Sequence, residues 1–161
     1  MYNHAAENYV CPICLGVQGR ENDQTMIKQD DIFFKDDLVM ALINSKFVGN
    51  NPGHVIVVPL EHFENIYDLP KEIGCRILLV AKTVAVALKE LRQCAGIMFQ
   101  QNNEPASGQH AFHYHLHIFP RFDNDHLHEH MTNARVSKPE ERKEYSQPLK
   151  DYFAKHPIPE A

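Results

Sequence analysis

Three histidines alternate with apolar residues in the segment 113–119, which reads His-Tyr-His-Leu-His-Ile-Phe. Side chains of a strand alternate between its two faces, so this pattern predicts that His113, His115 and His117 share one face and their apolar neighbours the other. Alternate residues of a strand lie about 7 Å apart. The three imidazoles are therefore close enough to contact one bound phosphate group or one metal ion.

A row of imidazoles suits phosphoryl chemistry. A neutral imidazole nitrogen is a good nucleophile toward phosphorus near pH 7, and a protonated neighbour can stabilise phosphate oxygens or donate a proton to the leaving group. The alternatives are a solvated strand face and simple metal ligation. Strict alternation beside an apolar face favours the chemical interpretation, because the apolar residues anchor the strand in a core.

The segment His126–His130 has the same alternate spacing, since it reads His-Leu-His-Glu-His. It lies among Asp and Asn residues and contains a single apolar residue, so no buried strand is predicted to hold its side chains. We expect a surface loop there, with adventitious metal binding as the minor alternative.

A second group with metal-binding chemistry is the pair Cys11 and Cys14, separated by Pro and Ile. Two cysteines at this spacing supply half of a tetrahedral zinc site, and the other two ligands must come from distant parts of the chain. The same spacing occurs in redox centres, but those follow a strand, and nothing strand-like precedes Cys11. Cys75 and Cys94 are expected to be buried small residues at the ends of a helix.

The elements that position these residues begin with two short strands. Branched or aromatic residues predict strands at 26–35 and 38–43, which form a hairpin around a polar turn at 35–37. A loop rich in Gly, Asn and Pro at 47–53 then precedes a β-branched strand at 54–59.

One long amphipathic helix follows Pro70, a residue that a first helical turn tolerates. The apolar residues that recur there at steps of three and four are Ile73, Ile77, Ala81, Val84, Leu88 and Leu91. Further strands are expected at 97–102 and 112–120. This order predicts an α+β fold, in which a mostly antiparallel sheet packs on one face against the helix.

One compact domain suits a chain of 161 residues with 43% hydrophobic composition. We assign residues 1–122 to this domain and residues 123–161 to a polar, partly flexible C-terminal tail, because four prolines interrupt the latter. A helix near 139–153 is the most structure that we expect in the tail.

Bulk properties exclude several classes of protein. No stretch reaches the roughly 20 apolar residues of a membrane span, and residues 1–10 lack the basic start and apolar run of a signal peptide. The formal net charge of -5 argues against a surface that coats nucleic acid. With four cysteines in reduced form, we expect a cytoplasmic protein without membrane or nucleic-acid partners.

The segment 107–121, Ser-Gly-Gln-His-Ala-Phe-His-Tyr-His-Leu-His-Ile-Phe-Pro-Arg, resembles the signature of the histidine-triad (HIT) family. Cys-Pro-Ile-Cys at 11–14, Ala-Leu-Ile-Asn at 41–44, Pro-Gly-His-Val-Ile-Val-Val-Pro-Leu-Glu-His at 52–62 and Asn102 are similar in order and spacing. The likeness covers about residues 10 to 121, and it is to the zinc-binding bacterial members and the fragile-histidine-triad-like hydrolases. It implies a HIT-like fold and a homodimer in which two sheets join into one.

The resemblance assigns roles to individual residues. It makes His115 the nucleophile, which forms a covalent nucleotidyl-imidazole intermediate that water later releases, and it places His117 against the phosphate oxygens. Asn44 falls where the family binds the ribose hydroxyls, and Leu42 where it lines the base pocket. Asn44 has an ordinary alternative as a turn or strand-end residue.

The resemblance also implies that three more polar residues lie near the phosphates or the leaving group. Asn102 and Gln109 fall where polar side chains meet the phosphates, although Asn102 could also be a simple strand-end residue. His110 stands where many family hydrolases carry Ser or Thr. It could act as a general acid for a poor leaving group, or it could only hydrogen-bond a distal phosphate.

For the metal, the resemblance completes the site of Cys11 and Cys14 with His62 and His113. The zinc would be structural, and His113 would tie the N-terminal segment to the catalytic strand. The function implied is a nucleotide hydrolase or transferase acting at the α-phosphate of nucleotide conjugates such as dinucleoside polyphosphates. Nucleoside phosphoramidates are an alternative substrate, and a non-catalytic, zinc-stabilised nucleotide-binding adaptor is the alternative function.

Overall fold

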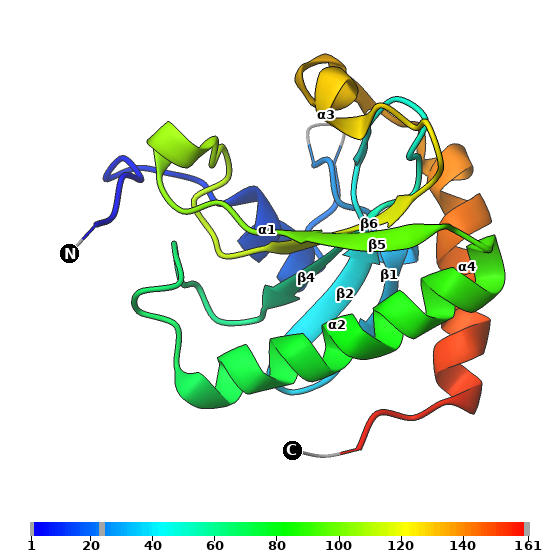
Figure 1. Ribbon diagram of the computed structural model, residues 1–161. Helices are drawn as coiled ribbons and strands as arrows, with labels where there is room; N and C mark the ends of the chain where they lie inside the picture. Colours follow the sequence, from blue (N-terminus) through cyan, green and yellow to red (C-terminus); the bar gives the residue numbers. More distant parts are fainter. Residues whose placement is uncertain (1, 23–24, 160–161) are drawn as a thin grey trace.

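The structure is a computed structural model that describes residues 2–22 and 25–159. Its helices and strands are α1 (Pro12–Val17), β1 (Ile32–Lys35), β2 (Val39–Ile43), β3 (Lys46–Phe47), β4 (Val55–Pro59), α2 (Lys71–Arg92), β5 (Gly96–Gln100), β6 (Leu116–Arg121), α3 (Leu127–His130), β7 (Arg135–Val136) and α4 (Pro139–Lys155) (Figure 1). Within the described ranges, no helix combines the length and the apolar character that crossing a bilayer requires.

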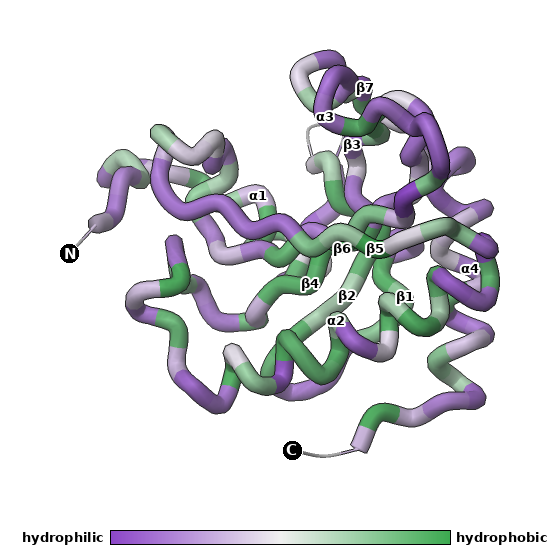
Figure 2. Tube along the Cα trace, viewed as in Figure 1, coloured by the Kyte–Doolittle hydropathy of each residue, from purple (hydrophilic) through white to green (hydrophobic). Residues whose placement is uncertain are grey.

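A five-stranded sheet in the order β1-β2-β4-β6-β5 forms the centre of the fold, and every neighbouring pair is antiparallel. All five residues of β2 and of β4 are buried. Alternate residues of these strands enter two different clusters, one shared with α2 and α4 and the other shared with Ile13 and Ile27. Figure 2 accordingly shows hydrophobic residues concentrated along β1, β2 and β4. The predicted α+β fold with a mostly antiparallel sheet is confirmed.

The long helix is also confirmed, and its buried face carries the predicted periodicity from Ile73 to Leu88, whereas the predicted Leu91 is exposed. Its buried apolar residues are Ile73, Ile77, Val80, Ala81, Val84, Ala87 and Leu88. Pro70 immediately precedes the first helical turn, and Gln93 ends the helix in a left-handed conformation with φ of 49°. The helix packs against β2, β4, β5 and β6, so it covers one face of the sheet.

The prediction of one strand over 26–35 is wrong in its first half. Only Ile32–Lys35 is strand, and Gln29–Asp31 is a 3₁₀ turn. The carboxylate of Asp31 accepts a hydrogen bond of 2.8 Å from the backbone N–H of Lys28, and this side-chain bond competes with extended pairing.

The strand predicted over 112–120 begins only at Leu116. The N–H of His113 bonds to the carbonyl of Ala111 at 2.9 Å, and the N–H of Tyr114 bonds to the carbonyl of Phe63. These bonds bend the chain, so strand alternation does not itself place His113 and His115 on one face. The apolar neighbours Tyr114, Leu116 and Ile118 are nevertheless buried in the main core, as the pattern predicts.

The C-terminal region contains α4, which covers the predicted helix near 139–153. Leu149 and Phe153 belong to the main core, and Phe153 packs against Phe33 with ring centroids 5.3 Å apart. A Cβ placed on Gly53 would collide with the Tyr145 ring, which shows how closely α4 approaches the start of β4. The division of the chain after residue 122 stays a prediction.

Two local predictions fail. The segment expected as a surface loop at His126–His130 contains the short helix α3, because Leu127 is fully buried with Val48 and Phe119. Cys94 is buried as expected, but Cys75 is exposed on α2, since it lies on the face of the helix that points away from the sheet.

Candidate functional site

A cavity of about 300 Å³ lies beside the sheet and contains two of the three alternate histidines. It is lined by Pro12, Ile13, Met26, Ile27, Asn44, Ser45, Lys46, Ile56, Asn102, Gly108, His110, Ala111, His115 and His117. Of the residues that the structure describes there, none is acidic and Lys46 is a cation. The cavity therefore suits an anionic ligand even though the whole chain is acidic. We call Ile13, Met26, Ile27 and Ile56 the apolar wall.

A larger hollow of about 590 Å³ lies between Glu21, residues 28–30 and the start of α4. Its charged lining residues are Glu21, Lys28, Asp30, Glu140 and Lys143, which mix both signs at the surface. It brings together no histidine or cysteine among its lining residues. Size alone therefore does not identify the site, and the smaller cavity holds the reactive groups.

His115 is held by the main chain. Its Nδ1–H donates a hydrogen bond of 2.7 Å to the carbonyl oxygen of His113. This bond fixes the tautomer that leaves a lone pair on Nε2. Burial lowers the pKa of His115, opposed by that same backbone bond, so the ring is neutral at pH 7. A neutral, oriented imidazole at a cavity wall is ready to act as a nucleophile.

His117 and His54 form a second pair of rings beside His115. The His117 ring lies 4.8 Å from that of His115 and 5.4 Å from that of His54, and both His117 and His54 stack on Phe119. Asn44 Nδ2 donates to His54 Nε2 at 2.7 Å. Burial lowers the pKa of His54 to about 3. Burial first, and then the proximity of the His115 imidazole, lower the pKa of His117 well below its usual value.

His54 is the functional candidate that sequence reasoning missed. It is 1% exposed, directly precedes β4 and lies behind Asn44 and His117. The signal in the sequence was the position of this polar residue, which follows Pro-Gly and directly precedes a β-branched run. Such a residue enters a core, so it needs a buried partner.

The remaining predicted substrate residues divide between the cavity and its surroundings. Asn44, Asn102 and His110 line the cavity, and His110 is exposed to solvent there. Leu42 is fully buried in the cluster that contains Ile27 and Ile56, so it lies behind the apolar wall rather than on it.

Gln109 does not line the cavity. Its side-chain amide donates to the carbonyls of Glu64 at 2.6 Å and Ala111 at 3.2 Å, and its oxygen accepts from the N–H of Glu104 at 2.7 Å. Glu104 has a φ of 68°, a conformation that non-glycine residues rarely adopt. Gln109 thus shapes the loop that carries His110.

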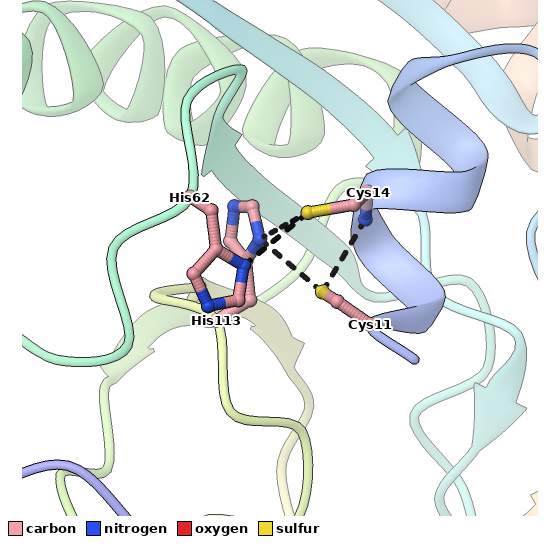
Figure 3. A group of neighbouring side chains, drawn as sticks. All are labelled: Cys11, Cys14, His62 and His113. Atoms are coloured by element: carbon pink, nitrogen blue, oxygen red, sulfur yellow. Dashed lines mark hydrogen bonds between the residues drawn. The ribbon is translucent and has the colours of Figure 1, made fainter. Parts of the chain in front are cut away.

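Four side chains of the kinds that bind metals, His113 among them, meet outside this cavity (Figure 3). Cys11, Cys14, His62 and His113 each offer one ligand atom, and these atoms all lie within 4.8 Å of one another. The Sγ atom of Cys14 lies 3.3 Å from Nδ1 of His62, and the Sγ atom of Cys11 lies 3.4 Å from Nδ1 of His113. The structure therefore brings together all four residues that the sequence predicts for the metal.

The environment of this cluster fits a cation. His113 Nε2–H donates to the carbonyl of Pro59 at 3.0 Å, which turns the lone pair of Nδ1 toward the thiols. Burial lowers the pKa of His113 to about 4. Burial and the adjacent Cys11 raise the pKa of the Cys14 thiol to about 12, so cation binding displaces a proton. Two sulfur and two nitrogen ligands are a donor set that zinc prefers.

The three alternate histidines consequently serve two sites. His113 points to the cysteines, whereas His115 and His117 line the cavity. The predicted common face is wrong for His113, because the bend before β6 turns its ring away. The two sites remain connected, since the carbonyl of His113 holds the ring of His115.

Comparison with known proteins identifies the family. The HIT domain family matches residues 26–124, which is more than half of the chain. This chain belongs to the HIT family. The structure agrees, because a zinc-bound histidine triad protein of this family from Mycobacterium smegmatis superposes with a TM-score of 0.70 at 24% identity, covering 90% of this chain and 94% of that one.

Two relatives in sequence carry HIT-type names. An uncharacterised HIT-like protein of Borreliella burgdorferi is 36% identical over 97 residues, and the match covers 57% of this chain and 66%, just under two thirds, of that protein. The bis(5'-adenosyl)-triphosphatase of Dictyostelium discoideum is 31% identical over 133 residues, which covers 83% of this chain and 88% of the relative. The HIT fold and the family are therefore established for this chain.

Proposed function

We propose that this HIT protein is a nucleotide hydrolase or transferase that cleaves at the α-phosphate through a covalent nucleotidyl-His115 intermediate. The observation that carries the proposal is the 2.7 Å bond from His115 Nδ1 to the His113 carbonyl, which aims a neutral nitrogen at an anion-compatible cavity. The name of the Dictyostelium relative, a bis(5'-adenosyl)-triphosphatase, supports this reaction class.

The chemistry has two steps. The lone pair of His115 Nε2 attacks the α-phosphorus, a nitrogen–phosphorus bond forms, and the bond to the leaving group breaks with its electron pair on the leaving atom. Water then attacks the same phosphorus, loses a proton, and expels the nitrogen, which releases a nucleoside monophosphate. His117, 4.8 Å from the His115 ring, is proposed to contact the phosphate oxygens, and the bound anion favours its protonated form.

The apolar and polar residues of the cavity are assigned to different parts of the nucleotide. We assign the base to the apolar wall, with Leu42 packed behind it, and the ribose hydroxyls to Asn44. Asn102 is assigned to the phosphates and His110 to the leaving group, whereas Gln109 acts only by shaping the loop. The cation Lys46 favours dinucleoside polyphosphates over nucleoside phosphoramidates as substrates. Only a dinucleoside polyphosphate releases a polyanionic leaving group, which a cation attracts.

The test is detection of the intermediate. The intact protein is mixed with diadenosine triphosphate, quenched in base because a nitrogen–phosphorus bond to histidine hydrolyses in acid, and its mass is measured by mass spectrometry. An adenylyl adduct is expected in the wild type and in His117→Ala, which should turn over more slowly. No adduct is expected in His115→Ala. Binding of the nucleotide without any adduct or turnover would instead support the adaptor function.

We also propose that Cys11, Cys14, His62 and His113 hold one structural zinc ion. The support is the S₂N₂ donor set, the fixed His113 tautomer and the zinc reported for the Mycobacterium smegmatis protein. Zinc would tie α1 to the segment that carries His115. Elemental analysis of protein purified without added metal is the test, and a stoichiometry near zero would remove this proposal.

Finally, we propose a homodimer that pairs the sheets of two copies along the edge strand β5. β5 ends the strand order, and in Figure 1 it forms the near edge of the sheet above α2. Phe99 on β5 is 45% exposed, and Leu78 and Val86 on α2 are also exposed. Light scattering should show Phe99→Glu as a monomer and the matched surface variant Val136→Glu as a dimer. A monomeric wild type would refute the proposal.

A further inference from the structure

The side chain of Arg142 in α4 is only 2% exposed, and it does not line the cavity of the proposed catalytic residues. Its Nε donates to Asp31 Oδ1 at 2.7 Å, and the Asp31 side chain is equally buried. Burying a charged pair is costly unless every donor finds an acceptor. Here the guanidinium also reaches two backbone carbonyls, those of Ser137 at 2.8 Å and Met26 at 3.2 Å.

Both carbonyl contacts lead to the cavity. Met26 belongs to the apolar wall, so the guanidinium holds the main chain of that wall directly. Ser137 in turn donates to the carbonyl of Ser45 through its backbone N–H and through its hydroxyl, each at 2.9 Å. Ser45 lines the cavity next to Asn44. One side chain therefore connects two separate stretches of the cavity lining.

Asp31 extends the same connection to Ile27, the neighbour of Met26 in the apolar wall. Its second oxygen accepts the N–H of Lys28 at 2.8 Å, which closes the turn directly after Ile27. From the other side, Ile27 packs against Gly16 of α1, where a Cβ would come within 2.8 Å of the Ile27 side chain. The wall is thus held between α1 and α4.

We propose that Arg142 is a positioning residue that sets the nucleoside-binding part of the cavity, acting through Met26 and Ser45. The inference rests on the proposed function, which assigns the base to the apolar wall and the ribose to Asn44. It makes α4 part of the substrate-binding machinery, although none of its described residues lines the cavity. The phosphoryl chemistry at His115 is independent of these contacts.

Lysine cannot replace this arginine. A guanidinium presents its N–H donors in a rigid planar fork, whereas the ammonium of lysine is a compact point charge at the end of a flexible stem. Arg142→Lys keeps the charge opposite Asp31 but loses the simultaneous contacts to Ser137 and Met26. The nucleoside part of the cavity is then expected to loosen while the ion pair persists.

The chain offers a matched control in Arg76. This residue is also buried, at 7% exposure, and pairs with Asp36 at 2.6 Å while donating to the carbonyl of Pro159. None of these three residues lines the cavity. Arg76→Lys therefore damages a similar ion pair without reaching the site.

The experiment measures hydrolysis of diadenosine triphosphate and binding of adenosine 5'-monophosphate by calorimetry. For Arg142→Lys we expect KM and the Kd for the monophosphate to rise about tenfold, with kcat within about twofold of the wild type. Arg76→Lys should leave all three unchanged while still lowering the thermal stability of the protein. Asp31→Asn and Ser137→Ala, which each remove part of the same connection, should raise KM by smaller factors and serve if Arg142→Lys does not fold.

The outcomes separate this inference from the proposed function. Equal KM values in the two lysine variants, with wild-type turnover and adduct formation intact, would overturn the role of Arg142 alone. A fall in kcat as large as the rise in KM would also overturn it, because a general structural loss affects both. A wild type that neither binds the monophosphate nor turns over would remove both proposals together.

Discussion

His113–His117 and His126–His130 carry the same alternate histidines, yet the folded chain gives them different surroundings. In the first segment His113 is fully buried, and His113 and His115 both donate to main-chain carbonyls. In the second, the His126 side chain is 56% exposed and lies 3.1 Å from Glu129, which is 74% exposed. Spacing is common to both segments, but in the first segment main-chain carbonyls orient the buried rings of His113 and His115.

The difference comes from the residues between the histidines. Tyr114, Leu116 and Ile118 all enter the main core, so the backbone between them is fixed. Leu127 alone is buried in the second segment, and one anchor produces a short helix instead of a strand. A reactive imidazole therefore requires apolar neighbours that immobilise its backbone, as well as the histidine itself.

The largest expected contrast is catalytic. His115→Ala should lower the turnover of diadenosine triphosphate by at least about 10³-fold, because the nucleophile is lost. His128→Ala, at the corresponding middle position of the exposed segment, should stay within about twofold. Steady-state kinetics of both variants decide the matter, and equal losses would show that the two segments do not differ in function.

A second contrast concerns metal. Cys11→Ser should abolish bound zinc and destabilise the protein by roughly 3 kcal/mol or more, since a structural zinc contributes directly to folding. Replacing His126, His128 and His130 together by Gln should leave the zinc content unchanged. Elemental analysis and thermal unfolding measure both effects. Zinc retained by Cys11→Ser but lost from the triple variant would reverse the assignment.

A third contrast is the pH dependence of stability. His54 is buried with a pKa of about 3, whereas an unfolded histidine titrates near 6.5. The unfolded state binds the proton first, so stability is lost as pH falls from about 6.5 toward 3, by up to ~1.4 kcal/mol per pH unit. Urea denaturation between pH 7 and pH 5 should show a shallower loss in His54→Gln. His126→Gln, at an exposed site, should match the wild type, and identical slopes in all three proteins would contradict the prediction.

The smallest expected effect belongs to His110, which lines the cavity but is exposed to solvent. His110→Ser should lower kcat at pH 7 by about tenfold or less, because water can replace part of a proton-donor role. The pH–rate profile distinguishes the two interpretations of this residue. A change in its acidic limb supports a proton donor, and an unchanged limb leaves only a hydrogen bond to a distal phosphate.

Local pattern predicted the framework of the fold and much of the candidate site. The helix, the hairpin, the β-branched strand and the Cys11–Cys14 pair all follow from short-range spacing, and the structure contains each of them. Two predictions failed for equally local reasons. The turn at Gln29–Asp31 depends on a hydrogen bond from the Lys28 N–H to the Asp31 carboxylate, and the bend before Leu116 depends on backbone bonds such as the one from the Tyr114 N–H to the Phe63 carbonyl. Such bonds leave no periodic signature.

By itself, the sequence determined which residues can do chemistry and which strands and helix must carry them, because periodicity and residue type act over a few positions. Only the tertiary structure decided their partners. It turned His113 toward the cysteines, placed His54 behind Asn44, and joined Arg142 to Asp31 across 111 positions of the chain. The physical reason is that a buried polar group must find a partner wherever packing offers one, and sequence distance does not constrain that choice.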